Sequence, residues 1–357
     1  MRTISIINQK GGCGKTTTSV NLSACLSEAG RKVLLVDLDP QGHSTLSFDY
    51  QPDKIQFTIY DAFATSRTNT FSWDKVLLKQ SENLYIAPAN LLLSFLEREL
   101  ANYIGREKIL LARLMELDKP FDYVIIDCPP SLGLLTVNAL TASSEAIVPI
   151  EPSFFSLHGL NKLLDTVRLQ EEKTGHIIKV HALVTIFNNR ARFDRELLRE
   201  IQSYFGQSLL RTIIRMSVKL GEAASFGKPI GSYNRSSIAY EDYNALASEI
   251  MMQEEYCVTE DSGLALKPQP IDGGIIFRYK NPEAAAVMLA GDFNNWSPDS
   301  GLMEKRDMAG LWERLITLDP GTYQYRFVVD GKWIADPSNP IKADDNLGGV
   351  NSVITIG

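Results

Sequence analysis

The run Lys10-Gly11-Gly12-Cys13-Gly14-Lys15-Thr16-Thr17 determines how the first part of this 357-residue chain folds. A glycine-rich loop that opens a helix binds phosphate, because its backbone N–H groups and the positive end of the helix dipole face the anion. Lys15 is placed to reach the β- and γ-phosphates of a nucleotide, and the Thr16 hydroxyl is placed to bind Mg²⁺. The usual pattern, G-x-x-x-x-G-K-[ST], fails at its first position, because Gln9 stands there and a second lysine, Lys10, follows it.

The residues around the loop predict a strand, a loop and a helix in succession. An apolar run at 4–7 precedes the loop, apolar residues recur at helical spacing over 17–29, and Gly30 can end that helix. Further β-branched runs predict parallel strands buried on both faces, at 32–36, 123–126, 146–150 and 180–184. Helices are expected near 92–116, 158–172, 194–205 and 239–253. The alternation predicts a doubly wound α/β domain with a mostly parallel sheet, the P-loop NTPase arrangement.

Carboxylates follow two of the predicted strands directly. Asp37 and Asp39 come after the strand at 32–36, and Asp127 comes after the strand at 123–126. The carboxyl ends of parallel strands form the ligand-binding edge of an open α/β sheet. We therefore expect these three side chains to lie beside the phosphate-binding loop.

The chain changes character after residue 253. Residues 254–272 are polar, aperiodic and contain Gly263, Pro268 and Pro270, which predicts a linker. Short alternating strands follow at 275–279, 286–289, 312–316, 323–329 and 352–354, with a hairpin turn at Asp330-Gly331. This spacing predicts a small all-β, immunoglobulin-like sandwich. The expected parts are an ATPase-like domain at 1–253, a linker at 254–272 and a β-sandwich at 273–357.

Charge is distributed unevenly along the chain, whose formal net charge is −7. Residues 251–357 carry 16 acidic and 9 basic side chains, whereas residues 179–235 carry 10 basic and 4 acidic ones. The basic segment could follow a phosphate backbone, although solvated helix faces would give the same pattern. Four cysteines without metal-ligand or disulfide spacing fit a reducing cytosol. Without a signal peptide or an apolar run of 18 residues, no transmembrane helix is expected.

The phosphate loop resembles the deviant Walker A box of the ParA/MinD family of ATPases, K-G-G-x-G-K-[ST]. The resemblance is to the ParA/Soj branch and covers residues 1–252. Further motifs carry it in order: Asn8-Gln9, 36–42, 127–133, Glu222-Ala223 and 225–230. Several motifs in sequence make a chance match improbable.

This resemblance implies ATP hydrolysis coupled to ATP-dependent homodimerisation, with ATP and Mg²⁺ as cofactors. Lys15 and Asp39 would be catalytic, with Asp39 positioning or activating the attacking water. Lys10 matches the signature lysine that reaches the partner's nucleotide, although the residues alone leave open a purely local phosphate contact. Asp37 and Asp127 would hold Mg²⁺ through water, together with Thr16. The resemblance implies that the ATP-binding residues are Gly11, Gly12, Cys13, Gly14, Lys15, Thr16, Thr17, Asn188, Arg190 and Ile214.

A departure from the family lies near the expected adenine site. Relatives often read I-P-R-N where this chain has Ile214-Arg215-Met216-Ser217. Arg215 and Lys219 are therefore candidate DNA contacts, and Lys219 is the better one. The resemblance implies non-specific DNA and a ParB-like stimulating protein as partners, and a cytoplasmic, nucleoid-associated location.

Two other members of the wider family fit less well. MinD-type proteins carry a membrane-binding amphipathic helix, but 240–252 lacks a Lys/Arg-rich face, so no membrane insertion is expected. A nitrogenase reductase needs a cysteine pair for an iron–sulfur cluster. Cys128 belongs to the Asp-Cys-Pro-Pro motif instead, and no well-spaced second cysteine accompanies it.

Residues 273–357 resemble the glycogen-binding module of the AMP-activated protein kinase β subunit. The motifs that carry this resemblance are 291–296, 321–333, Asp336-Pro337 and 346–351. It implies an α-glucan site formed by Trp296, Arg326, Trp333, Leu347 and Asn351. Gly349 stands where the family has threonine, which removes a hydroxyl contact. The tryptophans could instead fill the sandwich core, or the module could dock a protein; no carboxylate pair suggests glycoside hydrolysis.

Two functions remain open from the sequence. The first is a ParA-type partitioning ATPase that dimerises with ATP, binds DNA and is released when a partner stimulates hydrolysis. The second is an ATP-switched adaptor that positions a glucan or polysaccharide machine without binding DNA.

Overall fold

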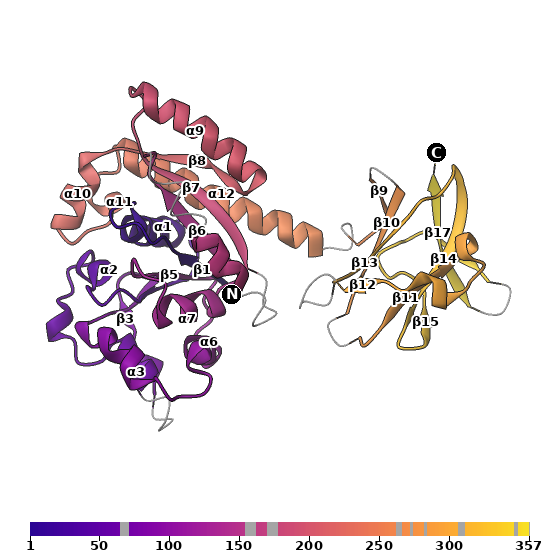
Figure 1. Ribbon diagram of the computed structural model, residues 1–357, viewed down its shortest axis with the longest axis horizontal. Coiled ribbons are helices and arrows are strands. Elements are labelled where there is room, and N and C mark those ends of the chain that lie inside the picture. The colour runs from indigo at the N-terminus through magenta and orange to yellow at the C-terminus, as the bar shows by residue number, and fades with distance from the viewer. Residues whose placement is uncertain are drawn as a thin grey trace. The chain divides into compact units, whose positions relative to one another are not determined.

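The computed structural model describes residues 1–64, 71–153, 162–169, 178–261, 266–271, 274–281, 284–305, 311–345 and 349–356 (Figure 1). The chain divides into two compact units, Met1–Ile250 and Met251–Gly357. Each unit is described by itself.

The first unit is built on one twisted sheet. Its described strands lie in the order β3-β4-β2-β5-β1-β6-β7-β8, and every neighbouring pair is parallel except β3 with β4. Their bounds are β1 Arg2–Ile6, β2 Val33–Asp37, β3 Leu78–Lys79, β4 Leu84–Ala87, β5 Tyr123–Asp127, β6 Glu145–Ile150, β7 Lys179–Phe187 and β8 Leu209–Arg215. The predicted mostly parallel α/β fold is confirmed.

Helices cover both faces of this sheet (Figure 1). They are α1 Lys15–Glu28, α2 His43–Leu46, α3 Ile59–Ala64, α4 Trp73–Val76, α5 Leu96–Glu99, α6 Ile109–Met115, α7 Leu134–Ala142, α9 Arg192–Phe205, α10 Val218–Ser225, α11 Ile230–Tyr233 and α12 Ile238–Asp261. Residues 162–169, within the helix expected at 158–172, are helical, and the rest of that prediction lies outside the described residues.

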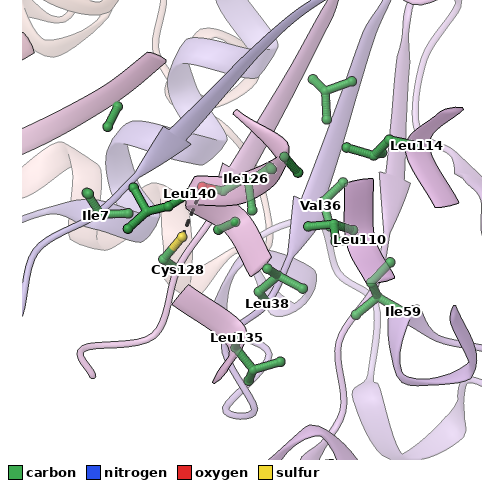
Figure 2. Close-up of a cluster of buried hydrophobic side chains, with 14 of the residues drawn as sticks. Ile7, Val36, Leu38, Ile59, Leu110, Leu114, Ile126, Cys128, Leu135 and Leu140 are labelled. Carbon is green, nitrogen blue, oxygen red and sulfur yellow. Dashed lines mark hydrogen bonds between the residues drawn. The ribbon is translucent and has the colours of Figure 1, made fainter. Parts of the chain in front are cut away.

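The core explains why the strands read as unbroken apolar runs. Val36 of β2 and Ile126 of β5 are fully buried and pack with Leu110 of α6 and Leu140 of α7 (Figure 2). Alternate residues of the same strands face the helices on the other side of the sheet, so both faces must be apolar. This packing fixes the carboxyl ends of β1, β2 and β5, from which the phosphate loop and its carboxylates extend.

Some elements differ from the sequence predictions. The helix expected at 92–116 is interrupted: α5 and α6 are separated at Gly105, whose φ of +80° is left-handed and breaks helical geometry. Strands β4 and β8 and helix α7 were not predicted. The short apolar segments of β4 and β8 carried too weak a pattern to stand out from loops.

The edge strand β8 is capped by carboxylates of α12. Glu249 accepts backbone hydrogen bonds from Arg211 at 2.7 Å and Thr212 at 2.9 Å, and Asp242 accepts one from Arg215 at 2.8 Å. An open sheet edge would otherwise offer these N–H groups to another strand. The acidic residues of this helix therefore complete the sheet.

The second unit contains two antiparallel sheets. One has the order β12-β13-β10-β9, and the other has the order β11-β14-β17-β16 with β15 paired to β14. The bounds are β9 Gln269–Ile271, β10 Gly274–Lys280, β11 Val287–Gly291, β12 Glu304–Lys305, β13 Leu311–Ile316, β14 Gly321–Val329, β15 Lys332–Ile334, β16 Lys342–Asp344 and β17 Val350–Ile356. Phe277 and Trp312 from one sheet share a core with Leu289 and Phe327 from the other. The predicted all-β fold is confirmed.

The segment predicted as a linker, 254–272, contains regular structure at both ends. Helix α12 continues to Asp261 where an end near 253 was expected, and β9 pairs with β10. The polar residues after 253 do not break a helix, because the first strong breaker, Gly263, comes later. In the described part of the chain, no helix is long and apolar enough to cross a bilayer.

Candidate nucleotide site and glycan face

Glycines give the phosphate loop its shape. Gly12 has φ +74° and Gly14 has φ +88°, a left-handed conformation that side chains with a Cβ rarely adopt. Gly14 directly precedes α1, whose first N–H groups face the loop. The Thr185 hydroxyl of β7 donates to the Cys13 carbonyl at 2.8 Å and ties the loop to the sheet. The predicted phosphate cradle is therefore present in its expected strand–loop–helix setting.

Lys15 is held inside the loop. Its ammonium donates to the carbonyl oxygen of Lys10 at 3.0 Å, and the residue is 7% exposed. The Cys13 thiol points to the same carbonyl at 3.2 Å, and burial raises its pKa, which leaves it a poor nucleophile. The cysteine therefore acts as a buried packing residue of the loop.

Asp37 and Asp127 are opposite one another on adjacent strands, β2 and β5, and both are fully buried. Hydroxyl groups satisfy them: Thr45 donates to Asp37 at 2.8 Å, and Ser19 and Ser44 donate to Asp127 at 3.0 and 2.8 Å. Burial raises the pKa of both carboxyls, and the charge of Asp127 raises that of Asp37 further. Two neighbouring buried carboxylates favour a cation close by.

The donor set fits Mg²⁺ better than a metal held by protein alone. In the part of the chain that the structure describes, no group of three His, Cys, Asp or Glu residues could hold a metal ion. Mg²⁺ usually uses one or two carboxylates, retained waters and substrate phosphates. Both oxygens of Asp37 and both of Asp127 already accept hydrogen bonds, which is compatible with contact through water.

A cavity of about 650 Å³ opens beside the loop. Residues that line it include Gly11, Gly12, Gly14, Lys15, Thr16, Thr17, Asp39, Gln41, His43, Pro130, Thr185, Ile186, Ile214, Arg215, Met216, Ser217, Val218, Leu220 and Tyr243. Asp39 is 8% exposed, and its side chain accepts a hydrogen bond from the Gln41 amide at 2.9 Å. The structure thus brings Asp39 to the same cavity as Lys15 and Thr16.

The expected adenine-site residues are only partly brought together. Ile214 lines the cavity, whereas Asn188 and Arg190 are exposed and lie outside its described lining. The Asn188 side chain accepts from the Arg190 amide at 3.1 Å, forming a turn before α9. Sequence reasoning missed Tyr243, whose hydroxyl lies 3.3 Å from that of Thr18, because it appeared as an ordinary apolar helix position.

The backbone is strained where β7 reaches the cavity. Ile186 has φ +55°, an uncommon conformation for a β-branched residue, and the β7–β8 register shifts between Val184 and Phe187. Such strain persists only where the surrounding structure enforces it, and it is concentrated at functional sites. Only the structure reveals this feature.

Lys10 is directed away from the cavity lining. Its ammonium donates to Glu151 at 2.5 Å and to the Ser153 hydroxyl at 2.9 Å. The Lys10 and Glu151 side chains are each 34% exposed. The first lysine of the motif is therefore at the rim of the site, where a second molecule can approach it.

The two candidate DNA contacts differ in their surroundings. Arg215 binds Asp242 through its Nε and Nη2, and lies 3.4 Å from Glu241. The Asp242 hydrogen bonds raise the pKa of Arg215 above its ordinary value. Lys219 makes an exposed pair with Glu222 at 2.7 Å, the kind that solvent and ions readily exchange. Lys219 is therefore the more available cation.

In the second unit, Trp296 and Trp333 lie together, with ring centroids 6.3 Å apart and planes inclined by 34°. The Asp292 carboxylate accepts from the Trp296 indole N–H at 3.0 Å and from the Gln324 amide at 2.7 Å. Asn295 and Trp296 have φ of +52° and +59°, so the turn that presents Trp296 is strained. Trp333 is 45% exposed, so it does not fill the core.

Polar residues continue this surface. Asn351 donates to the Gln324 side chain at 2.8 Å, and Arg326 pairs with Asp345 at 2.6 Å. The Asn351 Oδ1 and the Arg326 Nε are buried without a hydrogen-bond partner in the described structure. Leu347 lies outside the described residues. Sequence reasoning missed Asp292, Gln324 and Asp345, although Asp292 stood inside a quoted motif.

Two protein families match this chain. Residues 1–180 match the family described as AAA domain, and residues 274–357 match the one described as the glycogen recognition site of AMP-activated protein kinase. The two matches fall on the two compact units.

Individual proteins are similar to the first unit. The sporulation initiation inhibitor protein Soj of Bacillus subtilis is 41% identical over 69% of this chain and 97% of that protein. The chromosome partitioning protein ParA of Myxococcus xanthus is 40% identical over 71% of this chain and 89% of that protein. A Mycobacterium smegmatis structure, described as cobyrinic acid a,c-diamide synthase with bound ATP analog and magnesium, has 33% identity and a TM-score of 0.63. It covers 70% of this chain and 94% of that one.

Proposed function

The chain belongs to the ParA/Soj family, and from this premise we propose that it is an ATP-hydrolysing partitioning or positioning protein. One observation carries the proposal: Lys15, Thr16 and Asp39 line one cavity, while Lys10 lies at its rim in contact with Glu151. The cavity volume of about 650 Å³ is in the range of small-molecule sites. ATP with Mg²⁺ is the proposed ligand, as in the M. smegmatis structure with its ATP analog and magnesium.

The residues of the cavity have separate roles in this proposal. Lys15 and the loop N–H groups bind the phosphates, and Thr16, with Asp37 and Asp127 through water, would hold Mg²⁺. When bound, Mg²⁺ neutralises charge on the β- and γ-phosphates. Asp39 orients the attacking water, since it is the carboxylate on the cavity wall that follows β2. Positioning and charge stabilisation supply most of the rate in phosphoryl transfer.

We propose that turnover requires a homodimer. Lys10 is outside the lining of its own cavity, so its charge is available to a nucleotide held by a second copy. Positive charge that arrives only on association would make hydrolysis depend on dimerisation. In this form the protein would bind DNA non-specifically and be released when a ParB-like partner stimulates hydrolysis, in the cytoplasm and on the nucleoid.

The C-terminal unit would add an α-glucan contact. The exposed face of Trp333 and the adjacent Trp296 can stack on the apolar faces of sugar rings. Arg326 and Asn351 supply polar groups beside them, and the buried, unpartnered Arg326 Nε and Asn351 Oδ1 favour a polar ligand nearby. This unit favours a second candidate function, an ATP-switched adaptor that positions a glucan or polysaccharide machine without DNA.

A DNA mobility-shift assay with ATP separates the two functions. The partitioning function predicts binding that weakens with salt and is lost in Lys219→Glu. Lys79→Glu is the matched control, because Lys79 is an exposed lysine on β3, at the opposite edge of the sheet from β8. If the wild-type protein shifts no DNA at low salt while still hydrolysing ATP, the adaptor function replaces the partitioning one.

A further inference from the structure

The outer face of the β11–β14–β17 sheet is a polar surface beside the two tryptophans. Val328 is paired with Trp333, and Gln324 is paired with Val353, two residues after Asn351. Side chains alternate along strands, so Gln324, Arg326, Trp333 and Asn351 share one face. Their alternates, Tyr325 and Phe327, are fully buried in the core.

Arg326 is not a free cation on this face. Its Nη2 lies 2.6 Å from an Asp345 carboxylate oxygen, and the two side chains are 16% and 18% exposed. The Gly349 amide donates to the other Asp345 oxygen at 2.7 Å, and the Asp345 amide donates to the Gly349 carbonyl at 3.0 Å. Asp345 is thus fixed by backbone contacts on one side and by the guanidinium on the other.

Position 349 leaves room for this pair. A Cβ there would lie 2.3 Å from the Asp345 carboxylate and 2.6 Å from the Arg326 guanidinium. Both distances are far below contact, so a larger residue would displace the pair. Gly349 therefore permits the carboxylate to approach Arg326.

We propose that Asp345 makes this face selective for uncharged glucans by neutralising Arg326. The inference rests on the proposed glucan binding and deepens it. A guanidinium without a partner binds sulfate, phosphate and carboxylate groups strongly, often with two parallel hydrogen bonds. Paired with Asp345, Arg326 keeps donors for sugar hydroxyls but presents no net charge to an anionic chain.

The charge of the unit as a whole acts in the same direction. Residues 251–357 carry 16 acidic and 9 basic side chains. Like-charge repulsion disfavours anionic polysaccharides, and Asp345 places one of these acidic groups at the cation that such a ligand would use. Neutral α-glucans lose nothing by this arrangement, because stacking on Trp296 and Trp333 is insensitive to charge.

Affinity electrophoresis of the full chain in gels containing amylose or dextran sulfate tests the proposal. The wild type is expected to be retarded by amylose and not by dextran sulfate. Asp345→Asn keeps the side-chain size and an acceptor for the Gly349 amide, but releases the charge of Arg326. We expect it to gain about 2- to 5-fold retardation in dextran sulfate, and to lose that gain in 1 M salt.

Two further variants show whether the effect acts through Arg326. The double variant Asp345→Asn/Arg326→Gln should lose the gain, and Asp345→Glu should resemble the wild type. Asp345→Asn that matches the wild type in dextran sulfate, or a double variant that retains the gain, overturns the proposal.

Trp333→Ala distinguishes the failure of this inference from that of the glucan proposal. If amylose retards the wild type and not Trp333→Ala, glucan binding stands, and the dextran sulfate results alone decide the role of Asp345. If amylose retards neither, the glucan proposal fails and the selectivity proposal fails with it.

Discussion

The Lys10 ammonium lies 2.5 Å from a carboxylate oxygen of Glu151 in the same subunit. Ser153 adds a hydrogen bond at 2.9 Å, so the lysine has two partners within its own chain. A lysine that acts on a partner's nucleotide must give up these contacts first. The pair therefore opposes dimerisation, and each dimer would break it twice.

Glu151→Gln should strengthen the ATP-dependent dimer. An ion pair of this partial exposure contributes about 0.2–1 kcal/mol, so two broken pairs correspond to a roughly 2- to 30-fold lower dimer dissociation constant. Analytical ultracentrifugation with ATP measures it. Glu82→Gln, an exposed acid outside the site, is the control. An unchanged dissociation constant for Glu151→Gln would show that the pair does not oppose association.

Asp39→Ala should accumulate an ATP-bound dimer. The variant keeps Lys15, Thr16 and the loop, which bind the nucleotide, but removes the carboxylate that orients water. We expect hydrolysis to fall by about 10²- to 10⁴-fold, the usual contribution of such a group. Size-exclusion chromatography with ATP should then give a dimer peak where the wild type returns to monomer. Asp74→Ala, whose exposed side chain lies outside the cavity lining, should behave as the wild type.

Arg215 should matter more for stability than for DNA. Asp242 is 6% exposed and receives both the backbone amide and the guanidinium of Arg215. Removing one partner of such a pair leaves the other charge uncompensated, which costs about 1–3 kcal/mol at this partial exposure. Thermal unfolding should therefore show Arg215→Ala melting several degrees below Lys219→Ala. The mobility shift should show the reverse order of damage; equal melting temperatures would contradict the assignment.

The first unit was predictable because local and global signals agree there. Glycines at 11, 12 and 14, β-branched strands and terminal aspartates all have local sequence patterns with one structural solution. The phosphate loop, Lys15 and the buried carboxylates follow from them. The α12 helix was predicted to end too early because polarity after 253 was taken as a linker signal, although polar residues are good helix formers in solvent.

What the sequence could not supply are contacts between distant residues. Glu151, Asp242 and Asp345 have no local pattern, and each acquires its role from a partner far away in the sequence, at Lys10, Arg215 and Arg326. Asn188 and Arg190 were assigned to the base by motif, yet a turn before α9 uses the Asn188 side chain. Side-chain direction at a loop depends on the tertiary structure, so the motif alone could not decide it.

Stability of the first unit should fall in acid because of Glu145. Burial raises the pKa of this carboxyl, but hydrogen bonds from His181 and Arg2 outweigh burial and hold the pKa at about 2, below the ordinary 4.5. A depressed folded-state pKa contributes stability above 4.5, which is lost as pH falls from 4.5 towards 2. The loss should be about 3 kcal/mol. Urea unfolding across that range measures it, and Glu145→Gln should remove this component of the slope.

The orientation of Trp296 should depend on Asp292. This carboxylate joins the Trp296 indole to the backbone of β14 at Gln324, and the adjacent left-handed residues give the turn little stability of its own. Asp292→Ala should therefore release the ring and weaken amylose binding about 3- to 10-fold, the loss of one or two ordinary hydrogen bonds. Asp292→Asn keeps an acceptor and should retain part of the affinity. Asp319→Ala, an acid on the loop before β14, is the control. Full amylose affinity in Asp292→Ala would mean that Trp296 does not need this support to bind sugar.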